Sequence, residues 1–161
     1  MKNPKLKAKR IMKTYRQTIN ASQETVFPLL CPVREAEWLD GWQYTMIYSE
    51  SGLVEEGAVF STPREGEPDT VWVVTKHDPD KHVVEFTRFT HQSRTCILKI
   101  RVLPLNEEIS HVDISYTYTG ISSSGNGFID GLTEEAFRKD MKFWEDAVNH
   151  FINTGQQLKR A

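Results

Sequence analysis

The side chain with the clearest potential for chemistry is that of Arg88. Alternation along the chain places Arg88 on the same face as Val84 and Phe86, which is the face expected to be buried. An isolated buried charge is costly, so this guanidinium needs a partner. Two readings stay open. In the first, Arg88 has a structural role: it pairs with Glu35 or Glu37 at the edge of a cavity, or it reaches water at the edge of the sheet. In the second, it binds a carboxylate, phosphate or enolate oxygen of a ligand.

A carboxylate and two phenols are the other candidates. Glu35 and Trp38 are three residues apart on a predicted helix and share a face. This arrangement suits an acid–base site or a ligand clamp, and equally a helix docked by Trp38 with the carboxylate at its edge. Tyr116 and Tyr118 share the inward face of the last predicted strand, either as core residues or as polar contacts in a pocket. Glu35, Arg88 and Tyr116 are therefore the candidate catalytic residues.

Other kinds of chemistry find little support in the sequence. The five histidines are scattered, and we expect no metal site. No Ser or Cys has the context of a nucleophile, and the Rossmann and P-loop glycine patterns are absent, so we expect no cofactor. Cys31 and Cys96 have no partner at metal-ligand spacing and are expected to be buried thiols.

Composition and charge indicate a single globular domain. The chain has 161 residues, of which 39% are hydrophobic and 26% charged. No apolar run reaches the roughly 20 residues that cross a bilayer. The N-terminus lacks the apolar core of a secretory signal, so we expect a cytoplasmic protein. A net charge of −2 argues against nucleic acid as a partner, and the sequence carries no signal for an oligomeric state.

The chain is predicted to have three parts. Residues 1–10 form a basic and flexible tail, because lysines and arginines there come without any acidic residue. Residues 11–155 form the domain, and residues 156–161 form a C-terminal tail.

A long amphipathic helix is predicted over residues 132–154. Its apolar residues recur at spacings of four and three, at Phe137, Met141, Trp144, Val148 and Phe151. Thr133 is expected to cap its start and Gly155 to end it. The opposite face, which includes Lys142 and Glu145, is expected to face water. So broad an apolar face must be buried against another layer.

The residues before this helix read mainly as strands. Strands are predicted at residues 11–20, 42–49, 58–62, 69–76, 82–89, 93–103 and 109–120. Short helices are predicted at 23–30 and 33–39, and the short turns between strands favour antiparallel neighbours. The segment 122–127, SSSGNG, is expected to form a flexible lip over a pocket.

This order of elements resembles the START-like (SRPBCC) helix-grip superfamily, which includes the birch-pollen allergen group and polyketide cyclase/dehydrase-like proteins. The resemblance covers about residues 12–155. It is carried by Pro32-Val33-Arg34-Glu35-Ala36-Glu37-Trp38 ending in Gly41-Trp42, by Gly57-x-x-Phe60-x-Thr62, by Thr70-Val71-Trp72-Val73-Val74-Thr75, and by Thr119-Gly120 leading to Gly125-Asn126. It implies an α+β helix-grip fold, in which a curved seven-stranded antiparallel sheet wraps around the long C-terminal helix and two short helices follow the first strand.

We therefore expect a cavity between the sheet and the long helix that binds a small hydrophobic, aromatic or lipid-like ligand. The residues expected to line it are Trp38, Phe60, Trp72, Phe86, Arg88, Leu98, Tyr116, Tyr118, Met141, Trp144 and Val148. One alternative is a cofactor-independent cyclase or dehydratase, in which Glu35 or a tyrosine moves a proton and Arg88 stabilises an oxyanion. Another, implied by the resemblance, is a protein-interaction module that binds chaperones or ribosomes. Binding is preferred because the sequence shows no convincing acid–base pair.

Overall fold

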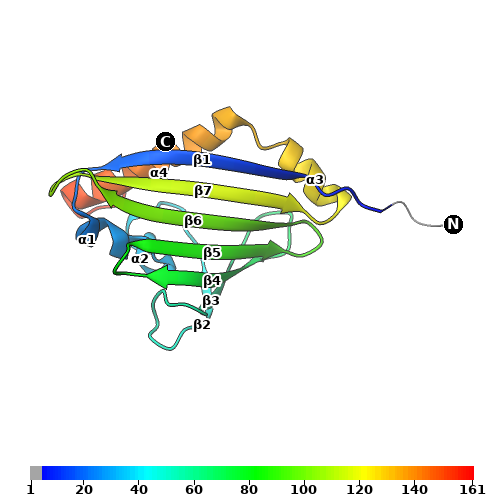
Figure 1. Cartoon of the computed structure of the whole chain (residues 1–161), viewed down its shortest axis with the longest axis horizontal. Helices are drawn as coiled ribbons and strands as arrows, with labels where there is room; N and C mark the ends of the chain where they lie inside the picture. The colour runs from blue at the N-terminus through cyan, green and yellow to red at the C-terminus, as the bar shows by residue number, and fades with distance from the viewer. Residues whose placement is uncertain (1–4) are drawn as a thin grey trace.

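One curved antiparallel sheet organises the chain (Figure 1). The computed structural model describes residues 5–161, so residues 1–4 of the expected basic tail lie outside the described part. Within residues 5–161 the sheet has seven strands in the order β1-β7-β6-β5-β4-β3-β2. Their bounds are β1 Arg10–Ile19, β2 Thr45–Tyr48, β3 Val59–Thr62, β4 Thr70–Asp78, β5 Val83–Thr90, β6 Arg94–Pro104 and β7 Ser110–Gly120.

The predicted strands are confirmed, but β2 is shorter than expected. Trp42 and Tyr44 were predicted to begin this strand, yet both precede it. Their rings stack with centroids 6.3 Å apart, and Trp42 Nε1 donates a hydrogen bond to the carbonyl of Pro32 at 2.8 Å. Trp42 in the alternating segment therefore contacts α2 instead of a neighbouring strand, and pairing with β3 begins only at Thr45.

The short helices lie at the two ends of the sheet. They are α1 (Gln23–Val26), the 3₁₀ turn η1 (Phe27–Leu29), α2 (Pro32–Trp38) and α3 (Ser123–Asp130). The predicted helix over 23–30 is thus split into α1 and η1. In Figure 1, α1 and α2 lie at one end of the sheet and α3 at the other. The concave face between these ends is covered by the long helix α4 (Glu134–Thr154).

The predicted caps of α4 are confirmed. The hydroxyl of Thr133 accepts a hydrogen bond from the backbone N–H of Ala136 at 3.1 Å, which satisfies a donor at the open end of the helix. Gly155 ends the helix with a φ of +72°, a left-handed conformation that glycine adopts without steric cost.

The prediction that Glu145 faces water is wrong. Its side chain is buried and accepts a hydrogen bond from the backbone N–H of Thr18 at 2.6 Å and another from Lys142 Nζ at 3.0 Å. Asn149 also contacts β1, because its amide donates to the carbonyl of Thr18 at 3.1 Å. β1 is an edge strand, whose outer backbone groups need partners. The polar face of α4 supplies them.

The prediction of a flexible lip at residues 122–127 is also wrong. Ser122 caps α3, since its hydroxyl accepts a hydrogen bond from the backbone N–H of Gly125 at 3.0 Å. A Cβ atom on Gly125 would lie 1.6 Å from the carbonyl oxygen of Ser93. The glycine is needed because α3 packs directly on the turn that precedes β6, and not because the segment must be flexible.

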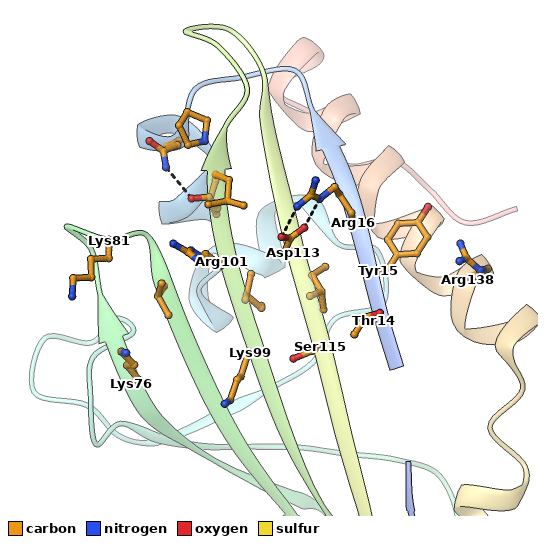
Figure 2. Close-up of a pocket in the computed structure, with 17 residues that line it drawn as sticks. Thr14, Tyr15, Arg16, Lys76, Lys81, Lys99, Arg101, Asp113, Ser115 and Arg138 are labelled. Carbon is orange, nitrogen blue, oxygen red and sulfur yellow. Dashed lines mark hydrogen bonds and ion pairs between the residues drawn. The ribbon is translucent and has the colours of Figure 1, made fainter. Parts of the chain in front are cut away.

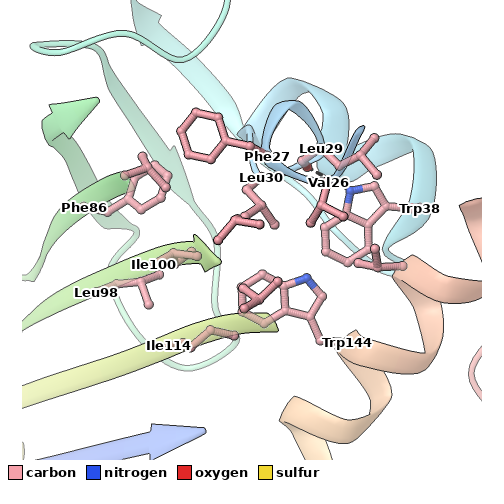
Figure 3. Close-up of a cluster of buried hydrophobic side chains, with 14 of the residues drawn as sticks. Val26, Phe27, Leu29, Leu30, Trp38, Phe86, Leu98, Ile100, Ile114 and Trp144 are labelled. Carbon is pink, nitrogen blue, oxygen red and sulfur yellow. Dashed lines mark hydrogen bonds between the residues drawn. The ribbon is translucent and has the colours of Figure 1, made fainter. Parts of the chain in front are cut away.

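The core fills the α1–α2 end of the space between sheet and α4 (Figure 3). Trp38 of α2 stacks on Trp144 of α4, with ring centroids 5.9 Å apart and ring planes 6° apart. Trp38 Nε1 also donates a hydrogen bond to the carbonyl of Leu29 at 2.9 Å. This pair joins α2 to α4 and closes one end of the interior.

Segments beside the predicted domain are held against it. The backbone N–H of Lys9 donates to Asn126 Oδ1 at 3.0 Å, so the chain before β1 contacts α3. At the other end, Leu158 forms a parallel bridge with Leu39, and the backbone N–H of Arg160 donates to Asp40 Oδ2 at 2.9 Å. Residues 158–160 therefore lie along the end of α2.

Candidate ligand cavity

A cavity of about 360 Å³ lies between the concave face of the sheet, α2 and α4. Its size is at the lower end of the range of roughly 300–1,000 Å³ that is typical of small-molecule sites. The residues that line it are Pro32, Glu35, Leu39, Trp42, Phe60, Trp72, Phe86, Arg88, Leu98, Tyr116, Asp140, Met141, Trp144 and Arg160. Its wall is thus mainly aromatic and aliphatic.

Most of the residues expected to contact a ligand line this cavity, but Trp38, Val148 and Tyr118 do not. Trp38 and Val148 are fully buried in the packed core, where Trp38 lies behind Trp144. Tyr118 lines a second and smaller cavity, nearer to α3. The periodicity of a strand or helix shows which side chains point inward. It does not show which of these are packed in the core and which line the cavity.

Three aromatic rings from neighbouring strands form one wall of the cavity. Phe60 and Trp72 stack with centroids 5.1 Å apart, and Phe86 meets Trp72 edge-on at 5.7 Å. Trp72 is held in place by a hydrogen bond from its Nε1 to Thr62 Oγ1 at 2.9 Å. The wall is therefore fixed before any ligand binds.

Arg88 stands at the α3 end of this wall. Its Nη2 donates hydrogen bonds to the hydroxyl of Tyr118 at 2.9 Å and to the sulfur of Cys96 at 3.5 Å. The guanidinium carbon lies 4.7 Å from the centre of the Trp72 ring and 5.3 Å from that of Tyr116. Cation–π attraction to these rings stabilises the charge in an apolar setting.

The ion pair considered for Arg88 is not formed. Glu37 pairs with Arg34 instead, and within residues 5–161 no carboxylate lies within ion-pair distance of Arg88. Burial alone would lower the pKa of Arg88, but the polar groups of Tyr118, Cys96 and Tyr116 outweigh it and hold the pKa above its usual value. Arg88 therefore carries a full positive charge with no acidic partner in the described chain.

Glu35 and Tyr116 also face the cavity without a protein partner. Neither the carboxyl group of Glu35 nor the hydroxyl of Tyr116 makes a hydrogen bond to another group within residues 5–161. Burial raises the pKa of Glu35 to about 8. It also raises the pKa of Tyr116, as does the nearby Glu35. At neutral pH both groups are mainly protonated, so each can donate a hydrogen bond into the cavity.

Two charged residues at the mouth were missed from the sequence. Asp140 lies three residues after Phe137 and four before Trp144, so it interrupts the apolar stripe of α4; this spacing was a usable signal. Arg160 was missed because it lies beyond the predicted domain. It reaches the cavity because residues 158–160 pack beside α2, where its guanidinium carbon lies 4.1 Å from the centre of the Phe143 ring.

A wider depression, with a volume of about 1190 Å³, lies on the opposite, outer face of the sheet (Figure 2). It is lined by Lys76 of β4, by Lys81 in the turn before β5, and by Lys99 and Arg101 of β6. Figure 2 also shows Arg16 paired with Asp113 through two hydrogen bonds, of 2.6 and 2.8 Å. This open cationic surface is unlike the aromatic interior and is not suited to an apolar ligand.

Two further features are absent from the part of the chain that the structure describes. No three or more His, Cys, Asp or Glu side chains of residues 5–161 gather where they could hold a metal ion. Among the helices of that part, none combines the length and apolar character needed to cross a membrane.

The fold is shared with solved structures of low sequence identity. The norcoclaurine synthase of Thalictrum flavum, in complex with dopamine and hydroxybenzaldehyde, matches with a TM-score of 0.66 and 12% identity over 90% of this chain and 87% of that one. An aromatase/cyclase from Streptomyces sp. R1128 matches with a TM-score of 0.62 and 9% identity, over 94% and 100%. The protein Ara h 8.0201 matches with a TM-score of 0.60 and 10% identity, over 91% of this chain and 99% of that one.

These likenesses establish the helix-grip architecture. A search of curated protein sequences found no match. The family model described as "polyketide cyclase / dehydrase and lipid transport" matches residues 12–145, which is most of the chain. The protein therefore belongs to the polyketide cyclase/dehydrase and lipid transport family, within the START-like helix-grip superfamily.

Proposed function

We propose that this protein binds a small aromatic or lipid-like molecule in the cavity between the sheet, α2 and α4. The observation that carries the proposal is a set of polar groups without protein partners inside an apolar cavity. Glu35, Arg88 and Tyr116 all face this space, and each leaves hydrogen-bonding capacity unused within residues 5–161. All three side chains are half-buried, so a ligand that displaces water from the cavity can supply the hydrogen-bond partners that each of them lacks in the protein.

The aromatic wall favours a flat ligand. Rings of Phe60, Trp72 and Phe86 are already fixed against one another, so a planar group can pack against them at little cost in conformational entropy. The norcoclaurine synthase structure, which has the same fold, contains two aromatic molecules. That precedent supports an aromatic ligand in this chain.

The proposal is tested by identifying what co-purifies with the protein. Small molecules are extracted from native protein and measured by mass spectrometry, in parallel with a Leu98→Trp variant whose larger side chain fills the cavity. We expect a molecule that is present with the natural protein and depleted from the variant. Circular dichroism and the melting temperature establish that the variant is folded. Equal amounts of the same molecules in both samples would contradict the proposal.

A second candidate function is acid–base catalysis without a cofactor. It is favoured by one observation, the pKa of about 8 for Glu35, which lets this group exchange a proton near neutral pH. In this reading the ionised fraction of Glu35 takes up a proton from the carbon next to a substrate carbonyl, and Arg88 stabilises the resulting enolate oxygen. Hydrogen–deuterium exchange at the methyl group of acetophenone, followed by NMR, tests it. Exchange no faster with the natural protein than with Glu35→Gln would count against catalysis.

A further inference from the structure

A second cavity, of about 220 Å³, lies at the α3 end of the concave face. It differs from the first in its lining, which includes three arginines, Arg64, Arg88 and Arg94, and three threonines, Thr62, Thr70 and Thr90. Arg88 lines both cavities and stands between them.

The charges around this cavity do not balance. Arg94 is buried and pairs with Glu67 through two hydrogen bonds, of 2.7 and 3.0 Å. Arg64 also lies near Glu67, with 3.6 Å between Nε and the carboxylate. Arg88 has no carboxylate within ion-pair distance among residues 5–161. Arg64 and Arg94 therefore share one carboxylate and Arg88 has none, so the three guanidinium groups that line the cavity leave an excess of positive charge.

Hydrogen-bond donors at the cavity remain available. Both contacts of Arg88 are made by Nη2, so its Nε and Nη1 groups have no acceptor within residues 5–161. The buried hydroxyls of Thr70 and Thr90 are 2.8 Å apart. Only one hydroxyl hydrogen is used between them, so the other is free to donate.

Phe128 of α3 holds two of the arginines at the wall. The guanidinium carbon of Arg94 lies 3.4 Å from the centre of the Phe128 ring, and that of Arg64 lies 5.0 Å from it. Stacking and ion pairing together fix Arg94 before a ligand arrives. Phe128 and Glu67 thus hold Arg64 and Arg94 near each other, while Arg88, which lines the same cavity, adds a positive charge that a bound anion would stabilise.

We propose that this second cavity is an oxyanion site that binds a phosphate group through Arg88, Arg64 and the threonine hydroxyls. A phosphate has several acceptor oxygens pointing in different directions, which suits donors that converge from separate strands better than a planar carboxylate does. The phosphate is either free or the head group of an amphiphile whose apolar part occupies the larger cavity, since Arg88 faces both spaces.

Titration calorimetry with inorganic phosphate at constant ionic strength tests the site by itself. We expect saturable binding at one site, weakened about tenfold or more in Arg64→Gln and in Arg88→Gln. The Arg64 side chain is 60% exposed, so its replacement leaves the core intact even if Arg88→Gln fails to fold. Sodium acetate at the same ionic strength should bind distinctly more weakly.

The outer cationic surface is the competing place for an anion, and Arg101 supplies the matched control. Arg101 is exposed and lies on that surface. Arg101→Gln should bind phosphate as the natural protein does. Loss of binding in Arg101→Gln together with unchanged binding in Arg64→Gln would overturn the proposal, and so would the absence of phosphate binding to the natural protein.

Octyl phosphate, compared with inorganic phosphate, distinguishes the two sources of the phosphate. If the anion is a head group, octyl phosphate should bind at least about tenfold more tightly than inorganic phosphate, because its chain is buried as well. If the site takes free phosphate, the chain should add nothing. Both outcomes support an oxyanion site, and neither depends on the aromatic ligand proposed for the larger cavity.

Discussion

The hydroxyl of Tyr118 accepts a hydrogen bond of 2.9 Å from Arg88, the residue that lines both cavities of the concave face. This bond holds the guanidinium at the boundary while leaving its Nε and Nη1 groups available. The guanidinium of Arg88 is therefore positioned by a phenol and by aromatic rings, and not by a carboxylate within residues 5–161.

Arg88→Met should weaken the binding of anionic aromatic molecules more than that of neutral ones. The probes are 1-anilinonaphthalene-8-sulfonate and neutral N-phenyl-1-naphthylamine, followed by fluorescence. We expect the affinity for the sulfonate to fall about tenfold, which corresponds to roughly 1.4 kcal/mol. Arg101→Met is the control. A large fall in melting temperature with equal effects on both probes would assign Arg88 a structural role.

The pKa of Glu35 predicts a dependence of stability on pH. Its pKa is raised from 4.5 in the unfolded chain to about 8 in the folded protein. Below both values the carboxyl group is neutral in either state. As the pH rises between them, the unfolded chain releases the proton first, so the free energy of unfolding falls; above about 8 the penalty is constant.

Glu35→Gln should remove this penalty. At pH 5 the variant should have nearly the same stability as the natural protein. At about pH 9 we expect the variant to be more stable by roughly 2 kcal/mol, since solvent reaching the cavity screens part of the effect. Urea unfolding at both pH values measures the difference. Equal stabilities at the higher pH would show that Glu35 is ionised without cost in the folded protein.

Trp38 and Trp144 should respond differently to the same replacement. Trp38 Nε1 donates to the carbonyl of Leu29, whereas Trp144 Nε1 is buried and has no acceptor within residues 5–161. Trp38→Phe should therefore cost about 1–2 kcal/mol more than Trp144→Phe, because it alone leaves a buried carbonyl unpaired. Equal costs in chemical unfolding would show that this hydrogen bond adds nothing.

Trp144→Ala should cost about 3–5 kcal/mol, because it removes a buried ring from between the core and the cavity. Thermal or chemical unfolding measures the loss. An unchanged melting temperature would mean that this face of α4 is not packed in solution.

Glu145→Ala should destabilise the protein by about 1–3 kcal/mol, because the backbone N–H of Thr18 on the edge strand loses its acceptor. Asp146→Ala is the matched control, since Asp146 is exposed and its contact is an ion pair with Lys142 on the surface; its effect should stay within about 0.5 kcal/mol. Hydrogen exchange at the Thr18 amide gives a local readout. Slow exchange in Glu145→Ala would contradict the assignment.

The periodic spacing of apolar residues was sufficient to predict the helices and strands of this fold. The spacing of Phe137, Met141, Trp144 and Val148 identified α4 and its buried face, and strict alternation put Val84, Phe86 and Arg88 on one side of β5. Such patterns are local, because backbone geometry alone decides which side chains share a face. Inspection of the chain could therefore indicate that Arg88 points inward.

Local patterns failed where a second segment decides the outcome. Glu145 looked like a surface residue because its partner, the Thr18 amide, is more than a hundred residues away in the chain. The segment SSSGNG looked flexible because the requirement at Gly125 comes from the close approach of Ser93. Trp38 was expected to contact a ligand, but the stacked ring of Trp144 separates it from the cavity.

The amino-acid sequence by itself determined the seven strands, the long C-terminal helix and an aromatic interior into which Arg88 points, since these follow from periodicity and residue type. Only the tertiary structure decided where the interior is filled and where it stays open. Cavities are the space left after side chains from distant segments have packed. The division into an aromatic cavity and an arginine-rich one depends on Arg88 of β5 contacting Tyr118 of β7 and Trp72 of β4.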